Sequence, residues 1–397
     1  MPSPLHLYVH IPYCVHKCHY CDFNSHVQSA PDWVGYQQAL ITELRAWLAT
    51  PMFAGRRIDS IFFGGGTPSL APSALIAAVI QTADQHASLD PACEISLEAN
   101  PGTVDAAHFR GYRAAGVNRL SIGAQSFHNQ ELAWLERIHS REAIIHAVQT
   151  ARAAGFEQLN LDLMYGLPMT EHRNPPMAAW LDSLQQAIDL APEHLSCYQL
   201  TVEPHTKLAV THARAPLPLP DDELAIDMLF ATRERLAQAD YHPYEISNYA
   251  RPDCHCRHND SYWLYHDYIG IGAGAAGKWD HASEDGGITR YSNLRQPATY
   301  IRAMLASNPQ QANAIHNEEQ LSCDEAAREA CWLGLRRQTG INRADFQSRF
   351  GFDPWDTFRA DLQPWQQRGM LAVALENISL TTTGLPLADA IAASVLA

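Results

Sequence analysis

The chain has 397 residues, of which 46% are hydrophobic and 18% are charged. These proportions exclude a disordered chain and a mini-protein, because they supply enough apolar side chains for a large packed core. The 43 acidic residues outnumber the 28 basic ones, and the resulting net charge of -15 repels phosphate backbones, so we expect no nucleic-acid partner.

Six extended, β-rich segments alternate with helical patterns in the first half of the chain. Strands are predicted at 5–11, 58–63, 94–99, 119–126, 158–166 and 194–202. Helices are predicted between them, for example over 104–115 and 141–154, and Gly116 and Gly155 follow these two as C-terminal caps. Such alternation predicts parallel strands with crossover helices, in an open doubly wound sheet or a barrel. In both folds ligands bind at the carboxyl ends of the strands.

The pattern changes after about residue 215, where a Pro-rich connection precedes a helix that ends near residue 239. Strands are then predicted on both sides of a dense polar stretch, at 241–250 and 268–277. The remainder shows helical periodicity and ends in a strand pair around 370–381. We therefore divide the chain into a main domain over 1–240, an extension over 241–310 and a C-terminal domain over 311–397.

Three cysteines, Cys14, Cys18 and Cys21, form a C-x3-C-x2-C motif directly after the first predicted strand. In this arrangement three thiolates hold three irons of a [4Fe-4S] cluster and leave the fourth iron open to a chelating small molecule. The alternatives are a zinc site or three incidental thiols, but zinc favours four ligands in paired C-x2-C spacing. The total of nine cysteines is odd and also disfavours a disulfide framework, so we predict the cluster.

This motif, placed after a strand in an alternating α/β chain, resembles that of the radical S-adenosylmethionine (SAM) superfamily. In that superfamily the amino and carboxylate groups of SAM chelate the open iron, and an electron from the cluster cleaves SAM to a 5'-deoxyadenosyl radical. The resemblance implies an α/β fold, namely a partial (β/α)6 barrel, followed by a small C-terminal domain of winged-helix type.

A glycine segment, Gly64-Gly65-Gly66-Thr67-Pro68, ends the second predicted strand. Glycines let the backbone approach a ligand and expose N–H groups to a carboxylate, although a plain tight turn has the same composition. The position of the segment matches the one that contacts the SAM amino group in radical SAM enzymes.

Polar residues also fall at the ends of the later predicted strands. Each one alone is explained equally simply as a helix cap or a salt-bridge partner. Together the segments LEANP, GAQSF, ERIH and DLMYGLP resemble, in this order, the radical SAM branch around the anaerobic coproporphyrinogen III dehydrogenase. The resemblance implies that the SAM pocket is lined by Tyr8, Tyr20, Gly65, Gly66, Thr67, Glu98, Gln125, Arg137 and Asp162.

Phe23 separates this chain from the dehydrogenases of the branch. They carry a fourth cysteine at that position, two residues after the third, and a longer segment before the cluster. Both differences match the HemW group, haem chaperones that resemble the dehydrogenase but lack its activity. In this family a histidine also commonly occupies the position of Ala276.

The polar stretch DCHCRHNDSYW at 253–263 bears on the same question. Imidazole or thiolate groups ligate haem iron and aromatic rings stack on a macrocycle, but a loop histidine more often forms hydrogen bonds and Tyr and Trp more often pack. The residues His258, Asn259, Tyr262 and Trp263 match the H-N-x-x-Y-W signature of HemW proteins. The resemblance implies haem binding by these four residues and leaves the iron ligand open.

We therefore predict a protein that binds haem as cargo and transfers it to an acceptor protein, with a respiratory enzyme as a candidate acceptor. The cluster and SAM serve as a structural or regulatory unit, and we assign no catalytic residue. The alternatives are a radical SAM dehydrogenase that decarboxylates a porphyrinogen, and a purely structural iron–sulfur protein. No apolar run reaches the ~20 residues that a bilayer requires, so we expect a cytoplasmic protein without stable membrane insertion.

Overall fold

The computed structural model describes residues 4–168, 176–280, 287–307 and 312–396. Six parallel strands form its centre: β1 (Leu5–Ile11), β4 (Ile58–Gly65), β5 (Leu89–Ala99), β6 (Arg119–Gln125), β7 (Gln158–Tyr165) and β8 (His194–Gln199). They pair in this order, each parallel to the next. All six predicted strands are therefore present, and the predicted partial (β/α)6 barrel is confirmed.

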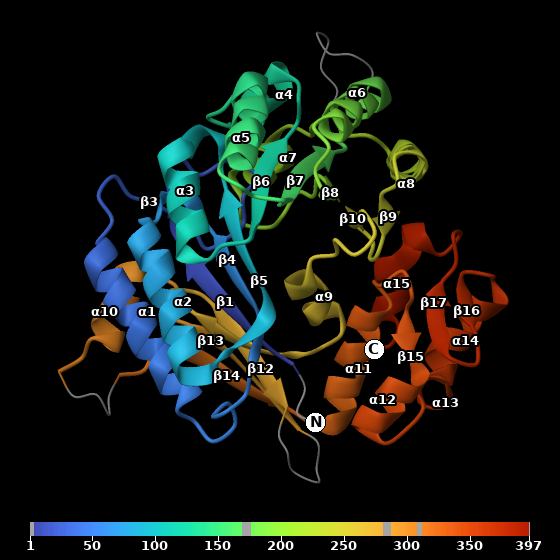
Figure 1. Ribbon diagram of the computed structural model, residues 1–397. Helices are drawn as coiled ribbons and strands as arrows, with labels where there is room; N and C mark the ends of the chain where they lie inside the picture. Colours follow the sequence, from blue (N-terminus) through green and yellow to red (C-terminus); the bar gives the residue numbers. More distant parts are fainter. Residues whose placement is uncertain (1–3, 169–175, 281–286, 308–311, 397) are drawn as a thin grey trace.

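Helices follow these strands, and those that lie between the strands in the chain cover the outer side of the sheet (Figure 1). They are α1 (Trp33–Leu48), α2 (Ser73–Ala87), α3 (Ala106–Ala115), α4 (Asn129–Trp134), α5 (Arg141–Ala153), α6 (Pro176–Asp189), α7 (Lys207–Arg214) and α8 (Asp222–Gln238). Asp105 begins α3 by accepting hydrogen bonds from two backbone N–H groups, and Gly116 ends it in the left-handed conformation at φ 110°. Both ends of this helix thus follow from local sequence.

The first strand illustrates how the barrel sorts its side chains. Leu5, Leu7, Val9 and Ile11 are buried in the main hydrophobic core. The alternate residues His6, Tyr8 and His10 carry polar groups and point to the other face, since successive side chains of a strand alternate. The interior of the barrel therefore carries polar groups along β1, and the site described below uses them.

The barrel does not close on itself, because other strands pair with both of its edges. The sheet has 12 strands in the order β14-β13-β12-β11-β1-β4-β5-β6-β7-β8-β10-β9. The added strands are β9 (His242–Pro243), β10 (Asn248–Ala250), β11 (Asp267–Ile271), β12 (Ala276–Asp280), β13 (Ile288–Asn293) and β14 (Ile315–Leu321). β11 is parallel to β1, and β12 to β14 follow as an antiparallel meander. The sheet of the barrel thus includes residues after position 310, where the C-terminal domain was predicted to begin.

Shorter elements complete this region. β2 (Tyr13–Cys14) and β3 (His26–Val27) pair with each other beside the barrel, α9 (Arg257–Trp263) packs over β4, and α10 (Pro297–Met304) packs on α1. No helix within the described ranges is both long and apolar enough to cross a bilayer.

The C-terminal part has its own hydrophobic core. Its helices are α11 (Cys323–Gly334), α12 (Arg343–Phe350), α13 (Pro354–Thr357), α14 (Arg359–Gln367) and α15 (Ala388–Ala393). Its strands β15 (Ile341–Asn342), β16 (Leu371–Val373) and β17 (Asn377–Leu380) form a separate antiparallel sheet, which includes the predicted strand pair. This combination fits the predicted winged-helix type, and the domain lies against α9 (Figure 1).

Candidate functional site

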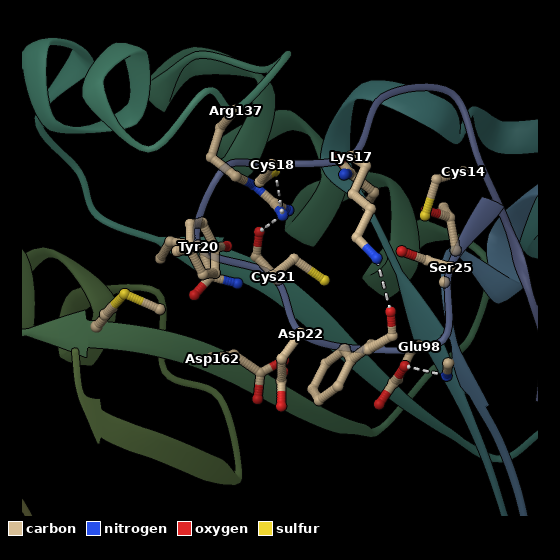
Figure 2. A pocket seen from close by; sticks show the side chains of 18 of the residues that line it. Cys14, Lys17, Cys18, Tyr20, Cys21, Asp22, Ser25, Glu98, Arg137 and Asp162 are labelled. Atoms are coloured by element: carbon tan, nitrogen blue, oxygen red, sulfur yellow. Dashed lines mark hydrogen bonds between the residues drawn. The ribbon is translucent and has the colours of Figure 1, made fainter. Parts of the chain in front are cut away.

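A pocket of about 370 Å³ lies at the carboxyl ends of the barrel strands. The loop after β1 forms one wall, and the ends of the neighbouring strands form the rest (Figure 2). The predicted residues that line it are Cys14, Cys18, Cys21, Tyr20, Gly65, Gly66, Thr67, Glu98, Gln125, Arg137 and Asp162. Of the residues predicted for the cluster and SAM, the structure leaves Tyr8 outside this lining.

The three cysteines face this pocket from a single loop, and all nine cysteines of the chain are free thiols. Thr67 Oγ1 lies 3.4 Å from Cys14 Sγ, and Arg137 Nη1 lies 3.9 Å from Cys18 Sγ. Burial raises the pKa of the Cys14 thiol and that of the Cys21 thiol. Among the residues described, no three His, Cys, Asp or Glu side chains converge on the position of one metal ion. Three soft thiols lining one pocket are the donor set of an iron–sulfur cluster with one open iron, so the residues fit this group.

The glycine segment lies directly against the cysteine loop. Gly66 N donates to Ile11 O at 2.8 Å. A Cβ atom added to Gly66 would lie 2.8 Å from Tyr13 O and 3.0 Å from Cys14 Sγ. Any side chain at this position would therefore displace the backbone or the thiol, which explains why the sequence has glycine here.

Two carboxyl groups lie on the side of the pocket away from Cys18 and Arg137 (Figure 2). Glu98 accepts a hydrogen bond of 3.1 Å from Gly65 N, and Asp162 accepts one of 2.9 Å from Ser121 Oγ and one of 2.8 Å from Asn160 Nδ2. Burial and the charge of Asp162 raise the pKa of Glu98 to about 8, and burial also raises the pKa of Asp162. A cationic ligand would relieve the repulsion between these carboxylates, which fits the ammonium and sulfonium groups of SAM.

Arg137 provides the opposite charge in the same pocket. Its Nη2 donates to Gly123 O at 3.0 Å, whereas its buried Nε has no acceptor among the described residues. Gln125 ends β6 in the left-handed region at φ 68°, an uncommon conformation for a residue other than glycine. A guanidinium that lines the pocket fits an anionic group such as the carboxylate of SAM.

A second cavity of about 670 Å³ lies between the barrel and the extension. The barrel contributes Tyr8 and His10, the extension contributes Tyr262, Tyr268, Ala276, Ser292, Asn293 and Arg295, and β14 contributes His316. The two cavities meet, because Phe23, Gly65 and Glu98 line both of them. Phe23, the residue that stands in place of the fourth cysteine, is 61% exposed at this junction.

The four residues predicted to bind haem are separated by the fold. His258 is only 2% exposed, and both of its ring nitrogens form hydrogen bonds, to Ser60 Oγ at 2.8 Å and to Tyr262 OH at 3.0 Å. Asn259 Nδ2 donates to Tyr244 OH at 3.0 Å. Trp263 lies under the guanidinium of Arg336, 5.0 Å from the ring centroid. Of the four, Tyr262 is the residue that lines the second cavity.

Sequence reasoning missed most of the residues that line the second cavity. Tyr268, Arg295 and His316 lie far from Tyr8 in the chain, and the pairing of β11 with β1 brings them together. The regular alternation of polar residues in LHLYVHI is the signal that would have indicated a polar interior face at this point.

The chain is similar to several known proteins. A model described as the radical SAM superfamily matches residues 8–181, and one described as the HemN C-terminal domain matches residues 321–387. The heme chaperone HemW of Haemophilus influenzae is 43% identical over 303 residues, which cover 75% of this chain and 76% of the relative. The heme chaperone HemW of Escherichia coli is 41% identical over 312 residues, 78% of this chain and 79% of the relative.

Two further proteins are similar over nearly the whole chain. The mitochondrial radical S-adenosyl methionine domain-containing protein 1 of Bos taurus is 34% identical over 398 residues, 98% of this chain and 87% of the relative. Among solved structures, the radical SAM enzyme coproporphyrinogen III oxidase (HemN) from Escherichia coli gives a TM-score of 0.80 at 25% identity. This match covers 99% of this chain and 90% of that one.

Proposed function

The chain belongs to the HemW family of radical SAM proteins, and from this membership we propose that it is a haem chaperone, which binds haem and transfers it to an acceptor protein. The observation that carries the proposal is its similarity to the curated heme chaperones over three quarters of their length. Phe23 supports it, because the position that holds a fourth cysteine in the related dehydrogenases lacks a thiol here.

The cofactors of the proposed chaperone are a [4Fe-4S] cluster and SAM. We propose that Cys14, Cys18 and Cys21 hold the cluster, and that the pocket around Glu98 and Arg137 holds SAM. Together the two groups would supply the one-electron chemistry of the radical SAM superfamily, and in the proposed chaperone they would serve as a structural or regulatory unit. Glu98 and Asp162 would hold the cationic part of SAM, Arg137 would hold its carboxylate, and Gly66 leaves room beside Cys14.

Haem is the proposed cargo, and the second cavity is its proposed site. A cavity of about 670 Å³ falls in the range typical of cofactor sites, roughly 300–1,000 Å³. Arg295 and His316 line it and provide polar partners for the haem carboxylates, while Tyr262 and Tyr268 provide aromatic surface. We propose that the acceptor is a haem protein, with a respiratory enzyme as the candidate, and that transfer takes place in the cytoplasm, where thiols stay reduced.

An anaerobic haem titration of cluster-reconstituted protein tests the proposal. We expect the Soret band to saturate near one haem per chain. The loaded protein is then mixed with an apo-haem protein that has a distinct spectrum. Haem should pass from the loaded protein to this acceptor faster than free haem passes into the same acceptor. A titration without saturation would contradict the chaperone function.

One observation favours a second candidate function, a radical SAM oxidase of coproporphyrinogen III. The similarity to HemN extends over the whole fold, including the C-terminal domain. Anaerobic incubation with coproporphyrinogen III, SAM and a reductant separates the two functions. Loss of carbon dioxide from the porphyrinogen, read from the product mass, would establish the oxidase, and we expect an unchanged mass.

A further inference from the structure

We propose that the second cavity selects tetrapyrroles whose carboxylates lie on one edge of the macrocycle, and that Arg295 binds this edge. The inference rests on the proposed function and specifies which iron porphyrins the site accepts. Haem carries its two carboxylates on neighbouring pyrroles, so one edge is anionic and the opposite edge is hydrocarbon. Coproporphyrin III carries one carboxylate on each pyrrole, so both edges are anionic. The distribution of charge in the cavity separates these two classes of ligand.

The lining of the cavity follows the order of strands in the sheet. Seven neighbouring strands contribute to it, in the order β14-β13-β12-β11-β1-β4-β5. His316 lies on β14 at one end of this run, and Glu98 lies on β5 at the other end. Tyr268 and Tyr8 lie between them, on β11 and β1. Neighbouring strands are about 4.8 Å apart, so aromatic surface several strands wide separates the imidazole of His316 from the carboxyl group of Glu98.

Arg295 supplies a positive charge at the same end as His316. It follows β13, and Leu294 N donates to Ala314 O at 2.8 Å, which holds this segment next to the start of β14. Arg295 is the single lysine or arginine among the described residues that line the cavity. His316 is exposed beside it, and a histidine ring always carries at least one N–H donor. This end can therefore bind more than one carboxylate.

The loop after β1 fixes the position of Arg295. The backbone oxygen of Arg295 accepts from Asn24 Nδ2 at 3.0 Å and from His26 Nε2 at 3.1 Å, and its Nε lies 3.5 Å from Asn24 Oδ1. Within the described part of the chain, neither Nη atom has an acceptor and the guanidinium forms no ion pair. Parallel N–H groups of a guanidinium match the two oxygens of a carboxylate, so Arg295 is held in place with its carboxylate-binding groups free.

The opposite end of the lining, as far as the structure describes it, holds no lysine or arginine. Glu98 lies there, where its carboxyl group accepts a hydrogen bond of 3.1 Å from Gly65 N. His10 also lines the cavity, but hydrogen bonds engage its ring nitrogens with Tyr8 OH at 3.0 Å and with the backbone oxygen of Asn24 at 2.9 Å. A ligand carboxylate beside Glu98 would therefore leave water without a counter-ion and next to another carboxyl group, which is unfavourable.

These contacts set the orientation of the bound porphyrin. The carboxylate edge lies against Arg295 and His316, and the macrocycle lies over the tyrosines between the two ends. The opposite edge points towards Phe23, which is 61% exposed at the junction with the SAM pocket. A hydrocarbon edge gains from burial against this ring, whereas a second pair of carboxylates would lose its hydration there. The cavity thus accepts haem and discriminates against iron porphyrins that are anionic on both edges.

The test compares three ferric porphyrins on cluster-reconstituted full-length protein without added SAM: haem, haem dimethyl ester and iron coproporphyrin III, each added from the same dilute detergent. Wild type should bind haem at least about tenfold more tightly than either of the others, a difference of about 1.4 kcal/mol. Arg295→Gln should weaken the binding of haem about tenfold and leave the affinity for the ester unchanged, because the ester has no carboxylate to lose. The control is Arg302→Gln, which removes the same charge from an exposed position on α10 outside the cavity lining and should match wild type with all three porphyrins.

Several outcomes would overturn the inference. Equal weakening of haem and ester binding in Arg295→Gln would show that Arg295 supports the shape of the cavity and does not bind a carboxylate. Binding of the ester or of iron coproporphyrin III by wild type as tightly as haem would refute selection for one anionic edge. Iron content and SAM binding of each variant show that it has folded. Absence of saturable haem binding by wild type would instead refute the proposed function, so the two failures are distinguishable.

Discussion

The pH dependence of SAM binding tests the electrostatics proposed for the cluster pocket. Burial and the charge of Asp162 raise the pKa of Glu98 to about 8. A cationic ligand beside Glu98 favours the ionised carboxylate. Below about pH 8, SAM binding therefore releases a proton from Glu98, and the affinity for SAM falls as the pH falls. With this pKa, about a tenth of Glu98 is ionised at pH 7 and about nine tenths at pH 9. We expect the affinity for SAM to rise about tenfold between these values, equivalent to about 1.4 kcal/mol.

Equilibrium binding of SAM to the cluster-loaded protein, measured anaerobically from pH 6 to pH 9, gives this profile. Glu98→Gln removes the titrating group and is the control, because any slope that it retains belongs to the ligand or the cluster. Asp162→Asn removes the repelling charge and should move the rise to lower pH. Coincident profiles of wild type and Glu98→Gln would refute the reasoning, since Glu98 would then not respond to the ligand.

Three further predictions concern the glycine segment, the haem iron and a buried carboxylate. Gly66→Ala puts a Cβ 3.0 Å from the thiol of Cys14 and should lower the iron content after reconstitution roughly twofold or more. The control is Gly102→Ala, whose Cβ would lie 3.3 Å from the side chain of Ile138, and it should retain the iron content. Ala276→His adds an imidazole to the second cavity and should convert the ferric haem signal from high to low spin; an unchanged spin state would place the iron elsewhere. Burial raises the pKa of Glu43 to about 7 from 4.5. The free energy of unfolding of wild type, measured with urea, should therefore fall by about 3 kcal/mol as the pH rises from about 4.5 to about 7. An equal dependence of the unfolding free energy on pH in Glu43→Gln would contradict this prediction.

The parts of the fold that could be predicted depend on local sequence. Strand β1 was predicted with its observed bounds because its seven residues form a continuous β-rich segment, and Gly116 ended its helix through a left-handed conformation that favours glycine. The cysteines of the cluster were found because three ligands lie within one loop. In each case the determining residues are neighbours in the chain.

The second cavity could not be predicted because its parts are distant in the chain. Tyr8 and Tyr262 face the same space only because β11 pairs with β1 in parallel, more than two hundred residues later. Sequence resemblance placed Tyr8 in the SAM pocket, but the depth of a side chain along a barrel strand depends on the register with its neighbours. That register puts Tyr8 beside Gly270 on one side and Phe62 on the other, in the adjoining cavity.

The signature His258-Asn259-x-x-Tyr262-Trp263 gains a physical explanation from α9. His258 and Tyr262 are four residues apart, so they lie on one face of the helix, where the imidazole supports the phenol. Asn259 and Trp263 are also four residues apart on a neighbouring face, and they attach the helix to Tyr244 and to Arg336 of the C-terminal domain. The second pair fixes the rotation of α9, and that rotation places Tyr262 in the lining of the cavity with its hydroxyl hydrogen-bonded to His258. The motif therefore uses both pairs, although one residue of the four lines the second cavity.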